Sequence, residues 1–545
     1  MTAIITQKYR QYLARLFKED IDDSSVDKNL YLFIGKFLPW EVDEVPPFPR
    51  DTVLNEFRIW DEMIALKKVK ESDSSYVIPR FDWDETEDTV YFPYSDDDPD
   101  MFLHPTPAEV AAGQLAPIPY TAGSMYVMTN DYHVFKCLDN AGGAKSTVKP
   151  LKPLVAPYIF EGADGYRWKY MFTVSGFEIE NYLTDEWIPL KTLEADDGSD
   201  QWLVQQNALA SQGTVQSVRI EAGGVDYFDV QDSDPENPDT QLVVSATANT
   251  VVLSTDASVV NNAYTDATIW IVGGTGAGQQ RRISTYIGAT KEATITDPWT
   301  TVPDATSEYQ ILPSLDITGD GTGLLLKPVV VGGVITRVLV VDVGQDYNSV
   351  SISVEGAGGS GAIIVPNLSP RKGHGADPVE ELGGSFVMLS VKLQYDEGDG
   401  DFPITNDYRV MGLLKNVLDA SSNIATDDTL IAVKKIVHSN TVGAFISDEL
   451  VTGGTSGAQG FIVQPEDLGG GDGTITFAQT EETGFTPFVA GETITGTVST
   501  ASAVIDTIES EEVSRYSGKL LYFEQRRPIM RAPDQQETIK LVSEF

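Results

Sequence analysis

The chain of 545 residues contains a single cysteine, Cys137. One thiol cannot form a disulfide within the chain or supply a cysteine-based zinc site, so the fold has to be held together by packing. The alternation of residues 132–138 predicts a strand, and a lone cysteine in a strand is usually a small buried hydrophobic residue. Cysteine chemistry is therefore not indicated.

Positive charge is scarce as well. The sequence has 38 lysine and arginine residues against 81 aspartate and glutamate residues, which gives a formal net charge of −43 at pH 7. Such a chain repels the phosphate backbone of nucleic acids, which proteins bind through clustered lysine and arginine. Anionic membrane surfaces are disfavoured for the same reason. We therefore expect no nucleic acid as a partner.

Long hydrophobic runs are also missing. No uninterrupted apolar stretch approaches the roughly 20 residues that cross a bilayer, and charged residues interrupt segment 1–20, where a signal peptide would need an apolar core. We therefore expect no membrane insertion and synthesis in the cytoplasm.

Metal-binding and nucleotide-binding motifs are sparse. The acidic stretch 396–401 lacks the spacing of an EF-hand and is expected to be a solvated loop. Residues 356–361 fit the pattern GxGxxG, but we expect a strand after them and not the helix whose N-terminus would hold a pyrophosphate. The four histidines are scattered and form no HExxH motif: His104, His133, His374 and His438.

These absences favour a protein without catalytic residues, cofactor or metal ion, and not an enzyme. A carboxylate pair for glycoside hydrolysis stays open, because 81 acidic residues form many pairs and none is singled out.

The composition that is present belongs to a folded protein of several domains. Hydrophobic residues make up 41% of the chain and aromatic residues 10%, enough apolar surface to offset the entropy of folding. Six of the eight tryptophans lie before residue 205, which indicates a dense core there. In contrast, residues 206–380 and 421–512 are rich in glycine, threonine and β-branched residues, which is typical of small all-β modules.

Two helices are expected near the N-terminus. Apolar residues recur at helical spacing from residue 5 to residue 17, namely Ile5, Tyr9, Tyr12, Leu13, Leu16 and Phe17. A second helix is expected after the prolines at 46–49, with Asp51 as its N-cap. Its inward residues would be Leu54, Phe57, Trp60, Met63 and Ile64. Beyond residue 76 the pattern is mostly strands and turns.

Internal repeats support the modular interpretation. The segment 215–230 recurs 120 positions later, with the glycine, aspartate and tyrosine of its turn retained. In the second module, a pattern recurs 43 positions later: Phe445, Glu449, Thr452, Gly453, Ser456 and Ala458 return as Phe488, Glu492, Thr495, Gly496, Ser499 and Ala501. Duplicated small β units bury their apolar faces on each other.

Aromatic and proline-rich motifs at both ends of the chain resemble a known family. The matching stretches are residues 3–10, 33–40, 46–54 (PPFPRDTVL), 77–83 (VIPRFDW), 134–139, 164–170, 386–416 and 518–529. In this order they resemble the gene-eight product family, the baseplate wedge subunits of T4-like contractile-tailed phages. The resemblance covers roughly residues 1–205, 385–420 and 513–545.

The resemblance and the composition together divide the chain into five parts. Residues 1–205 would form the N-terminal part of the wedge-protein core, 385–420 further core strands and 513–545 a C-terminal core segment. Residues 206–384 and 421–512 would be inserted β modules, the second with an internal repeat. We therefore expect a mainly β fold with a few helices: an α+β core resembling an antiparallel β-sandwich, with two inserted small all-β modules.

The resemblance implies a structural role in the virion tail baseplate. The chain would form a homodimer and link other baseplate wedge proteins by protein contacts, while the insertions contact the host surface. Aromatic and arginine side chains are common interface anchors, and we name Arg80, Trp83, Arg526 and Arg527 as interface candidates. An alternative is a tail-associated protein that binds or degrades host-surface glycans.

Overall fold

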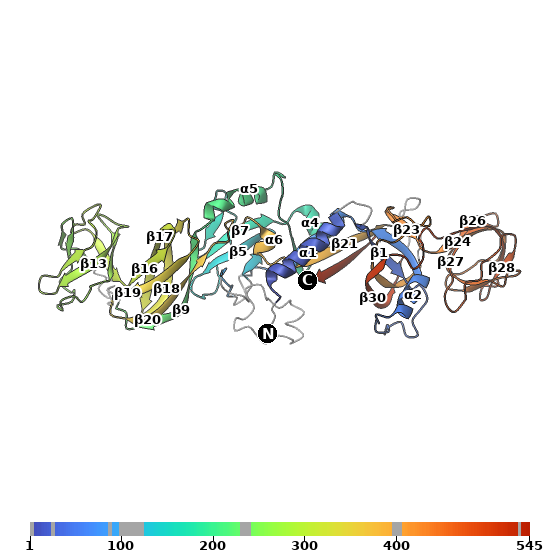
Figure 1. The fold of residues 1–545 in the computed structure, drawn as a ribbon, viewed down its shortest axis with the longest axis horizontal. Coiled ribbons are helices and arrows are strands. Elements are labelled where there is room, and N and C mark those ends of the chain that lie inside the picture. The colour runs from blue at the N-terminus through green and yellow to red at the C-terminus, as the bar shows by residue number, and fades with distance from the viewer. Residues whose placement is uncertain are drawn as a thin grey trace. The chain divides into compact units, whose positions relative to one another are not determined.

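A computed structural model describes residues 5–22, 28–84, 90–96, 125–228, 241–394, 406–531 and 536–545. The fold is mainly β with a few helices, as predicted (Figure 1). The acidic stretch 396–401 lies outside the described residues. None of the helices in the described ranges is long and apolar enough to cross a membrane.

The chain divides into two compact units. Unit 1 contains Met1–Val77, Glu180–Tyr182 and Ser385–Phe545, and unit 2 contains Ile78–Ile179 and Leu183–Gly384. The domain boundaries expected at residues 205, 384, 420 and 512 stay predictions.

The elements of unit 1 are α1 (Gln7–Asp22), β1 (Leu30–Gly35), α2 (Val53–Asp61), β2 (Met63–Lys68), η2 (Glu71–Asp73), β3 (Ser74–Pro79, which runs two residues past the division), β21 (Phe386–Gln394), β22 (Tyr408–Lys415), β23 (Thr429–Ile431), β24 (Lys434–Val442), β25 (Leu450–Gly453), β26 (Gln459–Gly469), β27 (Asp472–Ala478), β28 (Thr493–Gly496), β29 (Ser502–Glu509), β30 (Lys519–Ile529) and β31 (Gln536–Glu544).

The elements of unit 2 are β4 (Tyr126–Met128), β5 (His133–Asn140), β6 (Ile159–Glu161), β7 (Tyr166–Thr173), α4 (Gly176–Asn181, whose last two residues fall in unit 1), β8 (Trp187–Leu190), α5 (Asp200–Asn207), η3 (Ala208–Ser211), β9 (Val215–Val225), β10 (Ser245–Ala246), β11 (Thr250–Val252), β12 (Thr268–Gly273), β13 (Gln280–Ile287), β14 (Glu292–Ile295), β15 (Glu308–Leu312), β16 (Ser314–Gly319), β17 (Thr322–Val331), β18 (Val334–Gln345), β19 (Val350–Glu355), β20 (Ser360–Leu368) and α6 (Pro378–Glu381).

The centre of unit 1 is a five-stranded sheet in the order β23-β2-β1-β22-β30. Its strand β1 is buried along its whole length. Because side chains alternate across a strand, Leu30, Leu32 and Ile34 enter one hydrophobic cluster, while Tyr31 and Phe33 enter another. The unbroken apolar run of β1 therefore reflects a sheet that is covered on both faces.

The two faces of this sheet are covered by different elements. One cluster contains Val387 and Leu389 of β21 and Ile539 of β31, which belong to an antiparallel sheet with β3. The other cluster contains Ile59 and Trp60 of α2. Because β22 pairs with both β1 and β30, the N-terminal, central and C-terminal segments form one unit. This confirms the expectation that the matched segments at 1–77 and 513–545 fold together (Figure 1).

The apolar face expected for α1 is only partly covered. Ala14 is fully buried, and Phe17 packs against Phe545 with ring centroids 5.2 Å apart. The stripe of Ile5, Tyr9, Tyr12 and Leu16 is exposed. The helix approaches its sheet through a small residue, so its larger apolar side chains point away.

The expectations for the second helix need two corrections. The N-cap of α2 is Thr52, whose hydroxyl accepts a hydrogen bond from the Asn55 amide, and not Asp51. Trp60 is buried as expected, but Leu54 and Phe57 are 52% and 45% exposed. Only the last turn of α2 packs against the sheet, because the chain then turns directly into β2.

In unit 2 the repeat separated by 120 positions forms the same turn twice. Gly224 and Gly344 both have positive φ, +68° and +65°. A Cβ atom at Gly224 would lie 2.6 Å from the Tyr227 ring, and one at Gly344 would lie 2.7 Å from the Tyr347 ring. Glycine is required at both positions because the backbone is left-handed and a tyrosine packs directly on it.

A buried ion pair fixes the segment 370–384 within unit 2. Lys136 of β5 is fully buried and forms an ion pair with Glu381 of α6. Glu381 also accepts hydrogen bonds from the amides of Gly375 (2.8 Å) and Asp377 (3.2 Å). Burial lowers the pKa of Lys136, and the adjacent carboxylate opposes this shift. The pair is retained because each charge has a partner.

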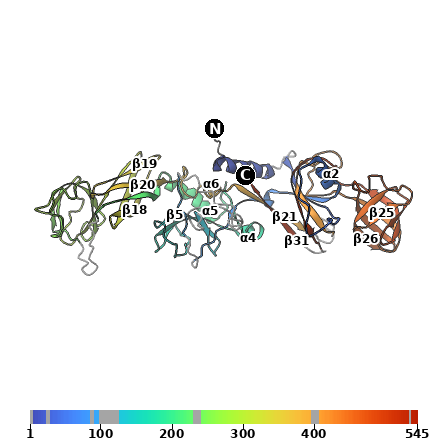
Figure 2. The same cartoon turned by 90° about the horizontal axis from the view of Figure 1, so that it is seen from below.

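The second module contains a closed barrel in the order β24-β27-β26-β25-β28-β29, labelled on the wall by β25 and β26 in Figure 2. Its two repeats clasp each other reciprocally. Glu492 accepts hydrogen bonds from the Ser456 amide (2.8 Å) and hydroxyl (2.8 Å) in the first repeat. Glu449 accepts hydrogen bonds from the Ser499 amide (2.9 Å) and hydroxyl (2.7 Å) in the second repeat. The sequence repeat is thus a structural repeat with crossed contacts.

These hydrogen bonds outweigh the effect of burial on both glutamates. Burial alone would raise the pKa of Glu449 and Glu492, but the backbone and serine donors hold the pKa of each carboxyl below its ordinary value. The stabilisation is therefore complete above the ordinary carboxyl range, and it is lost as the pH falls through the lowered pKa.

We predict that Glu449→Ala loosens the turn around Ser499, which lies in the other repeat. Several buried donors lose their acceptor, at a cost of about 1–3 kcal/mol, so amide exchange in β28 and β29 should speed up roughly ten- to a hundredfold. Hydrogen exchange with mass spectrometry measures this, with the exposed Asp472→Asn as the charge-matched control. Equal exchange in the two variants would contradict the reciprocal clasp.

Candidate interaction site

The loop between β1 and α2, residues 36–52, is fixed to the central sheet by a buried arginine. Arg409 of β22 donates from Nε to Asp43 Oδ1 (2.8 Å), from Nη2 to Asp43 Oδ2 (2.9 Å) and from Nη1 to the Phe37 carbonyl (2.7 Å). The hydrogen bonds from Arg409 hold the pKa of Asp43 below its usual range. This forked contact with a carboxylate fixes both distance and orientation.

Trp40 and Arg527 join the same loop to the edge strand β30. The indole Nε1 of Trp40 donates to the Arg526 carbonyl (2.9 Å), and Arg527 Nε donates to the Glu44 carbonyl (2.9 Å). Lys36 Nζ lies 5.2 Å from the centroid of the Trp40 ring. The proline-rich loop is thus anchored at several points along its length.

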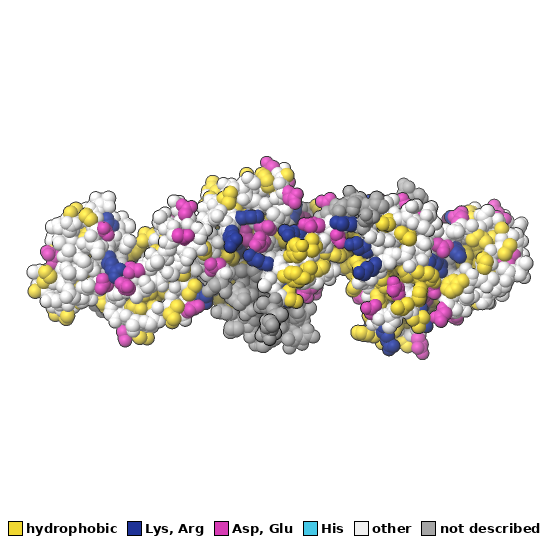
Figure 3. Space-filling model, in the orientation of Figure 1, with side chains coloured by type: hydrophobic (Ala, Val, Ile, Leu, Met, Phe, Trp, Pro, Cys, Tyr) yellow, Lys and Arg dark blue, Asp and Glu magenta, His cyan; other side chains and the backbone are white. Residues whose placement is uncertain are grey.

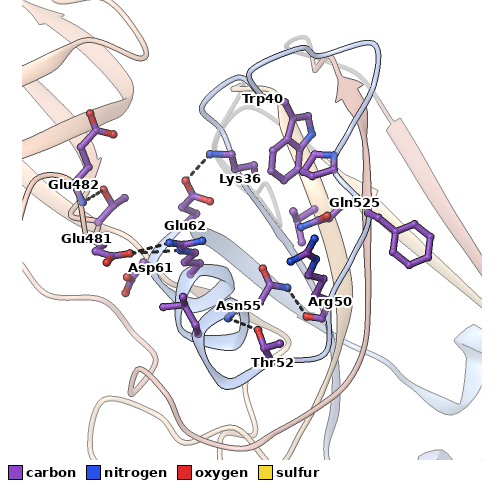
Figure 4. A pocket seen from close by; sticks show the side chains of 16 residues that line it. Lys36, Trp40, Arg50, Thr52, Asn55, Asp61, Glu62, Glu481, Glu482 and Gln525 are labelled. Carbon is purple, nitrogen blue, oxygen red and sulfur yellow. Dashed lines mark hydrogen bonds and ion pairs between the residues drawn. The ribbon is translucent and has the colours of Figure 1, made fainter.

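A cleft of about 990 Å³ opens beside this loop. Its walls come from the loop, from α2, from β22 and β30, and from residues 480–482 of the barrel (Figure 4). The lining residues are Lys36, Trp40, Pro47, Phe48, Arg50, Thr52, Leu54, Asn55, Arg58, Asp61, Glu62, Val410, Thr480, Glu481, Glu482 and Gln525.

Most charged groups in the cleft are paired with each other. Lys36 Nζ lies 2.6 Å from Glu62 Oε1, and Arg58 Nη2 lies 3.4 Å from Glu481 Oε2. Burial raises the pKa of Glu62, and Lys36 opposes the shift. Burial also raises the pKa of Asp61, whose carboxylate accepts a hydrogen bond from Tyr516 (2.6 Å).

Two polar groups of the cleft have no partner among the described residues. The Arg50 side chain is exposed and forms no hydrogen bond or ion pair there, although its carbonyl accepts a hydrogen bond from Asn55 Nδ2 (3.0 Å). The side-chain oxygen Oε1 of Gln525 is buried and receives no donor within the described part of the chain. Figure 4 places both side chains along the same wall.

The rim of the cleft is apolar and exposed. Phe48 is 87% exposed, Val45 71% and Val53 70%, and all three lie within a short stretch of sequence together with Leu54 and Phe57. Figure 3 shows hydrophobic side chains gathered over the region of α2. Large apolar side chains held in a rigid loop mark a contact surface, because isolated monomers rarely present them together.

Comparison with known proteins assigns this part of the chain. The family model described as "Bacteriophage T4, Gp8" matches residues 3–141. The "Baseplate wedge protein gp8" of Enterobacteria phage T4 is 31% identical over 205 residues, which make up 34% of this chain and 60% of that protein. Residues 3–141 are gp8-like. The resemblance predicted from the sequence is confirmed.

The chain spans about 60% of the length of the curated relative that it matches. The anchored loop 36–52 and α2 lie inside the gp8-like region, whereas the barrel residues 480–482 that complete the cleft lie outside it.

Two predicted interface residues, Arg80 and Trp83, belong to unit 2. Arg80 Nε donates to the Asp82 carboxylate (3.0 Å), and its Nη1 donates to the Thr184 carbonyl (2.9 Å). Trp83 is partly buried, and its indole donates to the Ser146 hydroxyl (3.1 Å). Both side chains are already engaged within their own unit.

The other two, Arg526 and Arg527, lie on β30 in unit 1 and are exposed. Arg526 Nε pairs with Glu524 at 2.9 Å, and both arginines contact the anchored loop as described above. The structure brings these two residues to the loop that borders the cleft, and it does not test their role in an interface. Arg50, Phe48 and Leu54 were not among the predicted interface residues, although Phe48 and Arg50 stand in the family-like motif 46–54.

The weak motifs have ordinary structural roles. Residues 356–361 join β19 to the strand β20, as expected from the sequence. Cys137 is fully buried, and burial raises the pKa of its thiol well above the usual value. Within the described residues, no group of three histidine, cysteine or acidic side chains is arranged to hold a metal ion.

We predict that Arg409→Met frees the loop 36–52. The variant removes three donors while keeping the length of the side chain, so amide exchange in the loop should rise about tenfold or more, with little change in the barrel. Hydrogen exchange measures both regions at once, and the exposed Arg526→Met serves as the matched control. Unchanged protection of the loop would contradict the anchoring role of Arg409.

Proposed function

We propose that the chain is a structural, non-enzymatic component of a baseplate wedge in a contractile phage tail and links other wedge proteins by surface contacts. The observation that carries the proposal is that the gp8-like region contains a rigid loop and helix with exposed apolar side chains. The virion tail baseplate is the location that the gp8 resemblance supports.

The physical properties of the loop suit a permanent contact. Proline restricts the backbone of residues 46–49, and Arg409 holds the loop in place from below. A surface that is already ordered loses little conformational entropy when a partner binds, so more of the contact energy appears as affinity. Arg526 and Arg527, beside this loop, remain in the proposed interface, and Arg80 and Trp83 remain proposals for unit 2.

The two β modules lie outside the gp8-like residues 3–141. We propose that they contact the host surface. A second candidate function, binding or degrading host glycans, is favoured by the combination in the cleft of Trp40 with Asp61 and Glu62, two carboxyl groups whose pKa is raised by burial.

We predict that the chain is present in tails purified from virions and stays with the baseplate when sheath and tube are removed. Mass spectrometry of the fractions measures this. Incubation of the purified chain with host envelope polysaccharide should release no oligosaccharide. Absence from the baseplate fraction would refute the structural role, and polysaccharide cleavage would favour the glycan alternative.

We also propose a homodimer held by unit 1. The exposed stripe of Ile5, Tyr9, Tyr12 and Leu16 on α1 supplies an apolar surface for a second copy. With a charge of −43 on each copy, association works against repulsion that salt screens, so salt should tighten the dimer.

Light scattering at low and high ionic strength tests the dimer. We predict a dimer for the full chain, stronger at high salt, and a monomer for the variant Tyr9→Ser/Leu16→Ser, whereas Leu468→Ser in the barrel should have no effect. A strict monomer at tens of micromolar in both salts would remove the dimer. A dimer that survives the α1 variant would place the interface elsewhere.

A further inference from the structure

We propose that the cleft beside α2 binds an extended acidic segment of another virion protein, with a carboxylate on Arg50 and an apolar side chain against Phe48 and Leu54. The inference rests on the proposed structural function and goes further, because it assigns the site and the chemistry of the partner. The argument has three parts: a free cation, an unused acceptor and an ordered apolar rim.

The free cation is Arg50. Three basic side chains line the cleft, and Lys36 and Arg58 are neutralised by Glu62 and Glu481. Arg50 is the lining cation that lacks a charged partner among the described residues. In a chain with more than twice as many acidic as basic residues, a guanidinium without a carboxylate is unusual. Its fork geometry suits a carboxylate from another chain.

The unused acceptor is Gln525. Its Oε1 atom is buried beside the cleft and receives no hydrogen bond from the described residues. A buried acceptor without a donor costs free energy, so an occupant with an N–H group gains by filling the site. A peptide backbone carries such a group at every residue except proline, and therefore an acidic peptide supplies both complements that the cleft lacks.

The apolar rim is ordered before any partner arrives. Phe48 lies in the stretch of prolines at 46–49, and Leu54 lies in the first turn of α2, which Thr52 caps. The hydrogen bond from Asn55 to the Arg50 carbonyl ties the loop to the helix. An exposed aromatic ring, an aliphatic side chain and an arginine in one rigid segment form the composition of an interface hot spot.

A glycan fits this cleft less well than a peptide. A sugar would stack on the Trp40 ring, but Lys36 lies over that ring and the indole N–H is already bonded to the Arg526 carbonyl. The carboxylates that would bind hydroxyl groups, Glu62 and Glu481, are held in ion pairs. The groups left free in the cleft are therefore those that complement a peptide.

The test is the charge reversal Arg50→Glu in the phage genome. We expect plating efficiency to fall about a hundredfold, because a repulsive pair replaces an attractive one, and we expect incomplete tails in electron micrographs. The matched control is Lys372→Glu, an exposed cation of unit 2, which should plate as wild type. Thermal unfolding of the purified variant should be unchanged, because the Arg50 side chain has no partner to lose within the described chain. Phe48→Ser provides a second, uncharged variant with the same expected phenotype.

Suppressor mutations identify the partner. Revertants of Arg50→Glu should carry a change from aspartate or glutamate to lysine or arginine in another virion protein. Normal plating of both variants, or suppressors confined to this chain, would overturn the inference. Complete tails that fail to adsorb to the host would also overturn it, in favour of a glycan. If the wild-type chain is missing from purified tails, the proposed function itself fails. If it is present and Arg50→Glu plates normally, only this inference fails.

Discussion

Arg409 reaches from the middle of the central sheet into the loop before α2 and gives three N–H groups to Asp43 and the Phe37 carbonyl. The guanidinium is almost fully buried, so removing its acceptors would leave an unpaired charge in the interior. The loop is thereby committed to one position on the sheet. The exposed ring of Phe48, the guanidinium of Arg50 and the start of α2 are all presented from that fixed base.

Charge pairing shapes the rest of the molecule in a similar way. With a net charge of −43, the chain has few cations to distribute, and the structure spends several of them on buried or clustered acids. Arg282 alone contacts Asp316, Asp266 and Glu355, which brings the module of β12 to β15 together with the pair β16-β19. In the barrel, where no cation is used, serine and backbone donors hold Glu449 and Glu492 instead. An acidic chain can fold in both ways, provided that every buried carboxylate is satisfied.

The sequence predicted the features that depend on local pattern. The alternation around Cys137 gave a strand, and the repeat around Glu449 and Glu492 gave a duplicated β unit. Helical spacing indicated α2 but could not show which turn would be covered, so Leu54 and Phe57 were assigned to the wrong side. The contact of Arg409 with Asp43 joins residues 366 positions apart, and no local signal predicts it. For the same reason, the sequence could not distinguish the paired Arg58 from the unpaired Arg50.

The most direct test of this account is a cryo-electron microscopy reconstruction of the intact tail at side-chain resolution. The account predicts density for this chain in the baseplate, with the loop 36–52 in its anchored conformation and a neighbouring protein covering Phe48 and reaching the Arg50 guanidinium. A baseplate that lacks the chain, or one in which this loop and cleft face open solvent, would contradict it.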